Sequence, residues 1–307
     1  MPKLIATTVI HGASKGESHG GIFIVDIDRR VVLQTVDENS EDIEWFGEEG
    51  GRGLRGIAFD GATLYIAASN RLIAYDRRFN QIDSWQNPYL KDCHGICVYE
   101  RNLFLASTGN DCILAFDLDK KKFHWAMRIM SEHFQFRPVT FDPMDPDGPI
   151  FINKLELKNV LGSKGGMYIS GMNTGGLLHF NGDAINMSVQ LPRGAQDAQL
   201  FRKGVVFNDS HAGVLRYSGD NEGAEDRALP VPFFTESDHS PQDSSAVRML
   251  RRGYARGLCV LSNRVVAGGC TPAGVSLYDL RENKGLLQVT FTKDTRTAIN
   301  SIAVWPE

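Results

Sequence analysis

Several side chains able to move protons or bind anions stand directly before short apolar segments that recur along the chain. His94 precedes Gly95 and a run of apolar residues, and Arg55 and Arg256 each precede a glycine in the same way. A histidine changes its charge near neutral pH, and an arginine binds carboxylates and phosphates through a rigid fork of donors. These residue types predict acid–base chemistry on an anionic substrate. The residues expected to be catalytic are His94, Asp197, His211 and Arg256.

The segments that follow Arg55 and His94 are two copies of one repeat. Residues 55–76 and 94–117 each contain three β-rich runs, and a more polar fourth run follows each copy. Four-stranded units that recur every ~40–45 residues are typical of β-propeller blades. Three further units of this kind begin at Asn153, Gln196 and Arg256.

The two ends of the chain each hold part of one more unit. Residues 1–37 supply three strands and residues 298–307 supply one, so the ends are expected to build a blade together. Such closure removes open sheet edges. The predicted fold is therefore all-β: residues 1–307 form a single six-bladed β-propeller domain, whose ring is closed by the C-terminal strand. Two insertions interrupt the repeat, at about 123–150 and 222–252, and the first is expected to cover part of the channel mouth.

The predicted architecture brings polar residues from different blades to one face. In a propeller the first strand of each blade lines a central channel, and the loop between the second and third strands opens at the same end. Polar groups that converge in this way are expected of a ligand pocket. The residues predicted to bind substrate are Arg55, Asn70, Asn110, Asn173 and His19. Two alternatives stay open: asparagine in a tight loop is also a turn former, and the arginines could belong to a structural ion network.

Composition narrows the classes of partner. The net charge is −4, with 42% hydrophobic and 23% charged residues, which is ordinary for a globular protein. This charge gives no attraction for nucleic acid or anionic membranes, and no apolar run approaches the ~20 residues of a membrane helix. The expected partner is a small-molecule substrate, and no motif indicates a nucleotide cofactor. The sequence makes no prediction of oligomeric state.

The cysteines and the N-terminus predict a location in the cytoplasm. The five cysteines are an odd number and fall mainly in apolar strand contexts, as expected of small buried side chains in a reducing environment. Residues 1–3 lead straight into a predicted strand, without the pattern of a signal peptide.

The last half of the chain resembles a known superfamily. The segments that carry the likeness are residues 254–258, Leu191 and Pro192 leading into Gln196, and residues 153–155 before a Gly-Gly-Met-Tyr strand. They resemble the six-bladed superfamily of gluconolactonase (senescence marker protein), paraoxonase and strictosidine synthase. A narrower likeness is to uncharacterised bacterial six-bladed propellers of unknown function.

The resemblance implies a calcium ion on the channel axis, since oxygen ligands from several strands hold calcium in the lactonase-like members. The counterparts in this chain are Asn153, Asp197 and Asn300, with Glu17 in place of the family's first-strand glutamate. The sequence departs from the narrower family at Phe151 and at Gln196 or Asp197, where that family has histidine. A divalent metal is therefore an open prediction, with calcium preferred to zinc or iron.

Two functions from different classes follow. The first is a small-molecule-processing enzyme, a hydrolase or lyase of lactonase or esterase type, in which a histidine moves protons at an axial pocket with possible help from a metal. The alternative is a non-catalytic propeller scaffold that binds a ligand or a protein. Fold alone does not decide between them, because propellers serve both roles.

Overall fold

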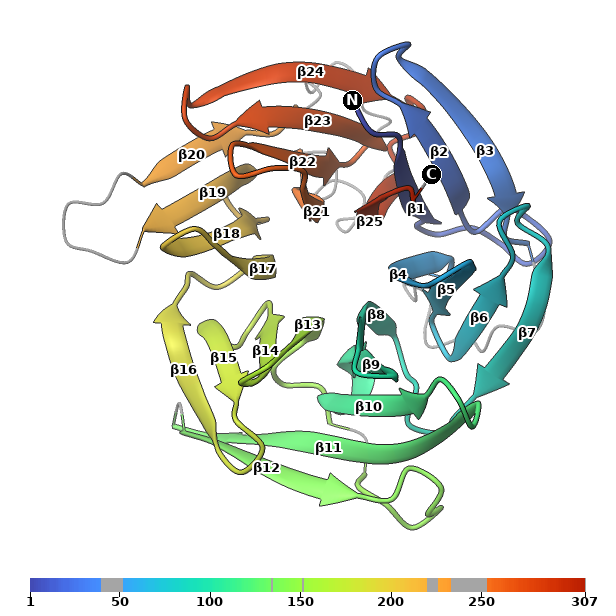
Figure 1. Ribbon diagram of the computed structural model, residues 1–307, viewed down its shortest axis with the longest axis vertical. Helices are drawn as coiled ribbons and strands as arrows, with labels where there is room; N and C mark the ends of the chain where they lie inside the picture. Colours follow the sequence, from blue (N-terminus) through green and yellow to red (C-terminus); the bar gives the residue numbers. More distant parts are fainter. Residues whose placement is uncertain (40–51, 134, 151, 220–225, 233–252, 307) are drawn as a thin grey trace. The chain divides into compact units, whose positions relative to one another are not determined.

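The computed structural model describes residues 1–39, 52–133, 135–150, 152–219, 226–232 and 253–306. These residues form six antiparallel sheets, the blades of a β-propeller, as predicted (Figure 1). By their contacts they divide into two compact units, residues 55–199 and residues 1–54 with 200–307. No described helix is long and apolar enough to cross a membrane.

The unit of residues 55–199 contains the second, third and fourth blades. Blade two has the strand order β4 (Leu54–Asp60), β5 (Thr63–Ala68), β6 (Arg71–Tyr75) and β7 (Gln81–Gln86). Blade three is β8 (Cys93–Tyr99), β9 (Asn102–Ser107), β10 (Cys112–Asp117), β11 (Lys122–Glu132) and β12 (Gln135–Phe141). Blade four is β13 (Leu157–Ser163), β14 (Gly166–Gly171), β15 (Gly176–Phe180) and β16 (Ile185–Gln190).

The other unit contains the first and sixth blades and most of the fifth. Blade one is β25 (Thr297–Val304), β1 (Leu4–Ile10), β2 (Gly21–Asp26) and β3 (Val31–Asp37). Blade five is β17 (Ala195–Phe201), β18 (Gly204–Asp209), β19 (Val214–Gly219) and β20 (Arg227–Pro230). Blade six is β21 (Arg256–Val260), β22 (Val265–Cys270), β23 (Gly274–Asp279) and β24 (Lys284–Thr290).

The last strand of the chain pairs with the first. β25 runs antiparallel to β1, with Val304 opposite Leu4 and Thr297 opposite Ile10. Figure 1 shows β25 beside β1 in the same blade. The prediction that the C-terminal strand joins the N-terminal blade is therefore confirmed.

The first predicted insertion is part of a sheet and not a loop. β11 and β12 form a hairpin in which Ala126 pairs with Phe141 and Glu132 with Gln135, and they are the fourth and fifth strands of blade three. The expectation that the whole segment is a loop was wrong, and cover of the channel mouth by residues 142–150 stays a prediction. Its alternation of aromatic and polar residues is the pattern of strands with one buried face. The second insertion, 222–252, lies mostly outside the described residues.

The fourth blade begins later than predicted. Its first strand was expected at residues 153–157, whereas β13 starts at Leu157 and ends at Ser163. The shift by four residues changes which side chain stands at the start of this strand.

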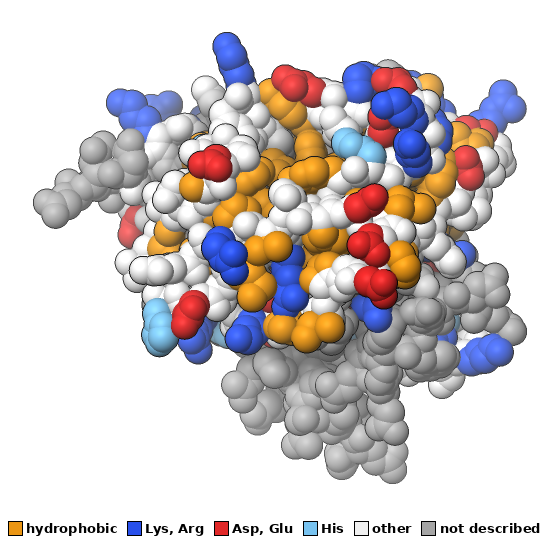
Figure 2. All heavy atoms as spheres, turned by 90° about the horizontal axis from the view of Figure 1, so that it is seen from below, with side chains coloured by type: hydrophobic (Ala, Val, Ile, Leu, Met, Phe, Trp, Pro, Cys, Tyr) orange, Lys and Arg blue, Asp and Glu red, His pale blue; other side chains and the backbone are white. Residues whose placement is uncertain are grey.

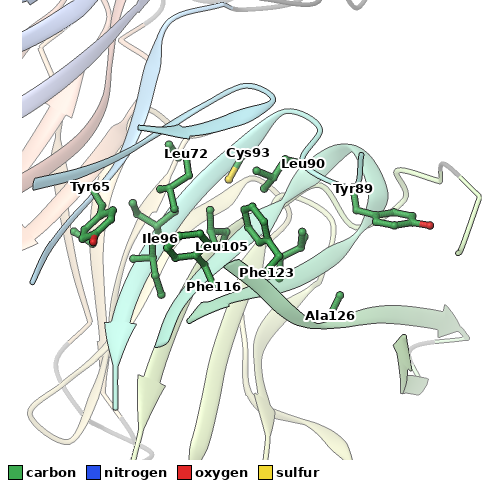
Figure 3. Close-up of a cluster of buried hydrophobic side chains, with 14 of the residues drawn as sticks. Tyr65, Leu72, Tyr89, Leu90, Cys93, Ile96, Leu105, Phe116, Phe123 and Ala126 are labelled. Carbon is green, nitrogen blue, oxygen red and sulfur yellow. The ribbon is translucent and has the colours of Figure 1, made fainter. Parts of the chain in front are cut away.

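A core of apolar side chains joins blades two and three. Phe116 is fully buried, and its ring lies 4.7 Å from that of Trp85 and 5.2 Å from that of Phe123, measured between centroids. Figure 3 shows Leu105, Phe116 and Phe123 together in this core, with Tyr65 and Leu72 of blade two beside blade-three strands. Each fully buried side chain of this size contributes about 1.5–3 kcal/mol. This packing holds the first strands of the two blades in place.

The hairpin of β11 and β12 exposes some apolar side chains, including Met130 and Val139. The face shown in Figure 2 carries hydrophobic side chains with Lys, Arg, Asp and Glu among and around them. In β12, Arg137 and Pro138 stand directly before Val139. A charge and a proline on an edge strand oppose pairing with another chain.

Candidate functional site

Glycines bring the first strands of blades two, three and four close together. A Cβ atom on Gly56 would lie 2.3 Å from the carbonyl oxygen of His94. A Cβ atom on Gly95 would lie 2.7 Å from the carbonyl oxygen of Lys158. No side chain fits at either position without a backbone shift, so these close approaches need glycine. The residue before each glycine, Arg55 or His94, is thereby placed next to the following blade.

Bulges occur in two of these strands at the same level. In β8, Cys93 pairs with Ser107 and Ile96 with Leu105, so that His94 and Gly95 together face one residue of β9. In β13, Leu157 pairs with Gly171 and Asn159 with Ser170, which leaves Lys158 without a residue opposite. Bulges re-aim side chains and are common beside active sites.

The result is a compact group of four side chains, Arg55, Asp92, His94 and Lys158, here called the inner cluster. The Nζ atom of Lys158 lies 2.9 Å from Nε2 of His94, and Nη1 of Arg55 contacts the same nitrogen. Arg55 also forms an ion pair with Oδ1 of Asp92, whose Oδ2 lies 3.5 Å from His94 Nε2. Arg55 and His94 are buried, Lys158 is half-buried, and the Asp92 side chain is 40% exposed. Solvent therefore reaches the cluster through Asp92 and Lys158.

The charges of the cluster determine the protonation state of His94. Burial lowers the pKa of His94 well below its usual value, and the positive charges of Lys158 and Arg55 lower it further. Burial alone would raise the pKa of Asp92, but Arg55, His94 and Lys158 outweigh it and hold that pKa well below the usual range. Near neutral pH the imidazole is therefore neutral and the carboxyl group is ionised. Its Nε2 lies in contact with both cations, and its single lone pair accepts from one of them at a time.

The neighbouring thiol is not a nucleophile at neutral pH. Burial raises the pKa of Cys93 to about 12, which keeps it protonated. A thiolate is the reactive form of cysteine. The chemistry of the cluster therefore depends on its imidazole, amine and guanidinium groups.

Two of the predicted residues, Arg55 and His94, are brought together, and two members of the cluster were missed. Asp92 precedes β8 and has no counterpart in the repeat that the sequence shows. Lys158 was missed because blade four was placed four residues too early. The sequence does hold a signal for Lys158. A four-residue pattern recurs at 54–57, 93–96 and 157–160: an aliphatic residue or cysteine, then a basic residue, then a small or polar residue, then an aliphatic residue.

The predicted asparagines of this unit have different surroundings. Asn70 is buried in the turn between β5 and β6, and the adjacent Ser69 accepts a 2.9 Å backbone hydrogen bond from Cys93. Asn110 is buried and donates a 3.1 Å hydrogen bond to the carbonyl oxygen of Tyr89, which is a structural contact. Asn173 is exposed in the turn after β14. Asn70 therefore lies beside the strand that carries His94.

Two predicted residues near β13 and β17 are not part of the inner cluster. Asn153 is exposed ahead of β13. Asp197 is half-buried in β17, with a left-handed backbone at φ 53°. Non-glycine residues in this region are uncommon and are often found at functional sites. The role of Asp197 stays a prediction.

The remaining predicted residues belong to the other unit. His19 is buried, and its pKa is lowered by burial and by Arg52. Arg256 lies over the ring of Tyr254, 4.8 Å from its centroid. His211 is exposed in the turn after β18, and Asn300 is half-buried in β25. Their roles also stay predictions.

The predicted calcium ligands show no acidic cluster. Glu17 is exposed, and its Oε2 accepts a 2.8 Å hydrogen bond from the backbone N–H of Ser14. In the described part of the chain, no three His, Cys, Asp or Glu side chains gather in a way that could hold a metal ion. Calcium sites use several converging carboxylate and carbonyl oxygens. A calcium ion held by Asn153, Asp197, Asn300 and Glu17 stays a prediction.

Comparison with known proteins supports the class of fold that the blades define. No family model and no curated protein matches the sequence. Among solved structures, a protein of unknown function from Bacteroides caccae is similar over 100% of both chains, with 12% identity and a TM-score of 0.61. A chain in the crystal structure of a nidogen/laminin complex is similar over 98% of this chain and 97% of that one, with 12% identity and a TM-score of 0.58. At this level of identity the likeness shows the fold alone.

Proposed function

We propose that this chain is a small-molecule-processing enzyme, a hydrolase or lyase, that binds an anionic substrate at the inner cluster and moves a proton with His94. The observation that carries the proposal is the buried, neutral imidazole whose Nε2 lies in contact with both Arg55 and Lys158. Strongly shifted titrating groups with defined charge partners are characteristic of functional sites.

The cluster has the charge needed to hold an anion. Arg55 and Lys158 carry two positive charges against the single negative charge of Asp92. Charges in a site partly shielded from water interact more strongly than they do on an exposed surface. A carboxylate or phosphate that enters beside Lys158 would therefore be attracted by the excess positive charge.

Substrate binding would also turn His94 into a better base. In the free protein its pKa lies well below the usual value, so that it is neutral but only weakly basic. A bound anion adds negative charge beside the ring, which favours imidazolium and raises the pKa of His94 toward neutrality. A base is most efficient when its pKa is near the working pH. Proton transfer would thus be coupled to anion binding.

An NMR titration of the His94 imidazole tests this coupling. We expect pyruvate or inorganic phosphate to raise its pKa, whereas the ring signals of the exposed His124 serve as the internal control and do not respond to either anion. A His94 resonance that does not respond to either anion would contradict the proposal. Turnover of small lactones, aryl esters and 2-hydroxy acids by wild type and His94→Gln then tests catalysis, with an expected loss of about 10²–10⁴-fold in kcat. His124→Gln is the matched variant.

A second candidate is a non-catalytic ligand-binding propeller. The observation that favours it is that Arg55, Asp92 and His94 already satisfy one another. This candidate predicts anion binding with no turnover of any compound in the panel. A protein partner is the other form of this candidate, and it predicts neither anion binding nor turnover.

Membership of the gluconolactonase, paraoxonase and strictosidine synthase superfamily, and with it a calcium requirement, is part of the same proposal. The fold supports the superfamily, and the metal rests on the resemblance alone. Elemental analysis of the purified protein tests the metal directly. A cytoplasmic location is supported by the cysteines, since all five are described and none forms a disulfide.

A further inference from the structure

The position of Lys158 supports an inference that rests on the proposed function and goes beyond it. Lys158 stands at a bulge in β13, is half-buried, and has its amine 2.9 Å from the imidazole of His94. We propose that Lys158 is a nucleophilic amine that forms an imine with the carbonyl group of a small 2-oxo acid.

The single lone pair on His94 Nε2 faces two cations. Both Arg55 Nη1 and Lys158 Nζ contact this nitrogen. A neutral imidazole nitrogen accepts through one lone pair, and a guanidinium group does not lose its proton in proteins. When one of the two cations gives up a proton, it is therefore Lys158. The neighbouring permanent charge of Arg55 favours the neutral amine.

A lysine becomes reactive when its amine loses the proton. The neutral amine is the nucleophile, and a neighbouring cationic group is one of the means by which proteins produce it. Asp92 offsets part of this effect, but it is paired with Arg55 and is 40% exposed. Lys154 offers a comparison within the same segment, because its side chain is exposed and its backbone N–H donates to Oδ2 of Asp111. The proposal predicts that the amine of Lys158 forms an imine and that of Lys154 does not.

The chemistry balances with the groups present. The lone pair of Nζ attacks the carbonyl carbon, a C–N bond forms, and the C=O π electrons move to oxygen. His94 Nε2 takes the proton from nitrogen and delivers it to that oxygen, which gives a carbinolamine. The proton that remains on nitrogen then passes through His94 to the hydroxyl group, which leaves as water while the nitrogen lone pair forms the C=N bond. One amine and one carbonyl give one imine and one water, and no oxidant or reductant is needed.

The same geometry indicates the acid group of the substrate. Arg55 binds carboxylates through its planar fork, and it keeps its positive charge when Lys158 is neutral. A carboxylate adjacent to the carbonyl carbon would lie on the cationic side while the carbon faces Lys158. The substrate class is therefore a small 2-oxo acid and not a neutral ketone.

Reductive trapping tests the imine. The full chain is incubated with pyruvate and sodium cyanoborohydride, and alkylated lysines are identified by peptide mass mapping. We expect saturable labelling concentrated at Lys158, loss of that labelling in Lys158→Arg, and no change in the control Lys154→Arg. Acetone, which lacks the carboxylate, should label Lys158 on the order of tenfold less at equal concentration, a difference equivalent to about 1.4 kcal/mol. Labelling spread over surface lysines would overturn the proposal.

A second measurement needs no carbonyl compound and no variant. Competitive acetylation with trace acetic anhydride at a series of pH values reports when each lysine becomes a free amine. We expect the midpoint for Lys158 to lie at lower pH than that for Lys154, and coincident midpoints would contradict the inference. If pyruvate shifts the His94 resonance but is never trapped, the imine is wrong and the proposed function stands. If pyruvate and phosphate leave His94 unchanged, the proposed function itself fails.

Discussion

Blades two and three are joined by two groups of ions that differ chiefly in burial. The inner cluster, Arg55, Asp92, His94 and Lys158, lies where the first strands approach each other. The outer network consists of Arg101 at the turn between β8 and β9, which contacts Asp60 at 2.8 Å and Asp119 at 2.7 Å. The side chains of Arg101 and Asp119 are 53% and 65% exposed, whereas that of Arg55 is 4% exposed.

The comparison shows why only one of these groups is a candidate site. Exposed ion pairs are screened by water and contribute little to stability. Buried ions lose hydration, so each must be balanced by a specific partner, and their protonation changes strongly with their surroundings. Unlike the outer network, the inner cluster holds a neutral histidine in contact with two cations. Burial, and not the number of contacts, distinguishes a reactive group from a surface contact.

The largest difference is expected when each group loses a carboxylate. Asp92→Asn removes the carboxylate that pairs with Arg55 beside His94, and we expect a loss of about 3 kcal/mol, at the lower end for a broken buried pair because Asp92 is itself partly exposed. Asp119→Asn is the matched variant in the outer network and should not change stability measurably. Urea unfolding at pH 7 compares the two. Equal losses of stability in the two variants would show that burial does not distinguish the inner cluster from the outer network.

The close approach of the first strands gives the next prediction. Gly95→Ala would place a methyl group against the backbone of Lys158 and Asn159. An added Cβ lies 2.7 Å from the carbonyl oxygen of Lys158 and 2.9 Å from Cα of Asn159. We expect a loss of about 2–3 kcal/mol from overpacking. Gly285→Ala is the control, because nothing lies within 4 Å of an added Cβ there. A Gly95→Ala protein as stable as this control would mean that the inner strands are not in contact.

The pH range over which stability changes should distinguish the inner cluster from the outer network. The pKa of His94 is lowered on folding, so below about pH 6.5 the unfolded chain binds a proton that the folded chain does not. Stability is therefore present above this pH and falls as the pH decreases, by about 1–2 kcal/mol between pH 7.5 and 5. His94→Gln should flatten this dependence. His19 also has a lowered pKa and contributes with the same sign, so the informative quantity is the difference between wild type and variant.

The fold could be predicted from the sequence because its signals are local. The repeats that begin at residues 55 and 94 identified the blades. The partial units at the two ends of the chain predicted that these ends form one blade together. The candidate site was predicted only in part. Arg55 and His94 stand at strand starts that the repeat marks, whereas Lys158 depends on the register of β13 and Asp92 on the path of a loop. Register and bulges are set by packing against neighbouring blades, which one sequence does not show.

The smallest effect is expected from the outer arginine. Its hydrogen bonds lower the pKa of Asp119, so removing the guanidinium in Arg101→Ala should let that pKa return toward its usual value in a carboxyl NMR titration. A depressed carboxyl pKa adds stability above its unfolded value, which is lost as the pH falls through the folded value, so any change should be confined to acid pH. At pH 7 we expect no resolvable change in urea midpoint, because solvent screens the pair. Anion binding, followed at His94, should also be unchanged. If Arg101→Ala instead altered the His94 titration, the two groups would be coupled through β8, and the inner cluster could no longer be treated as a separate site.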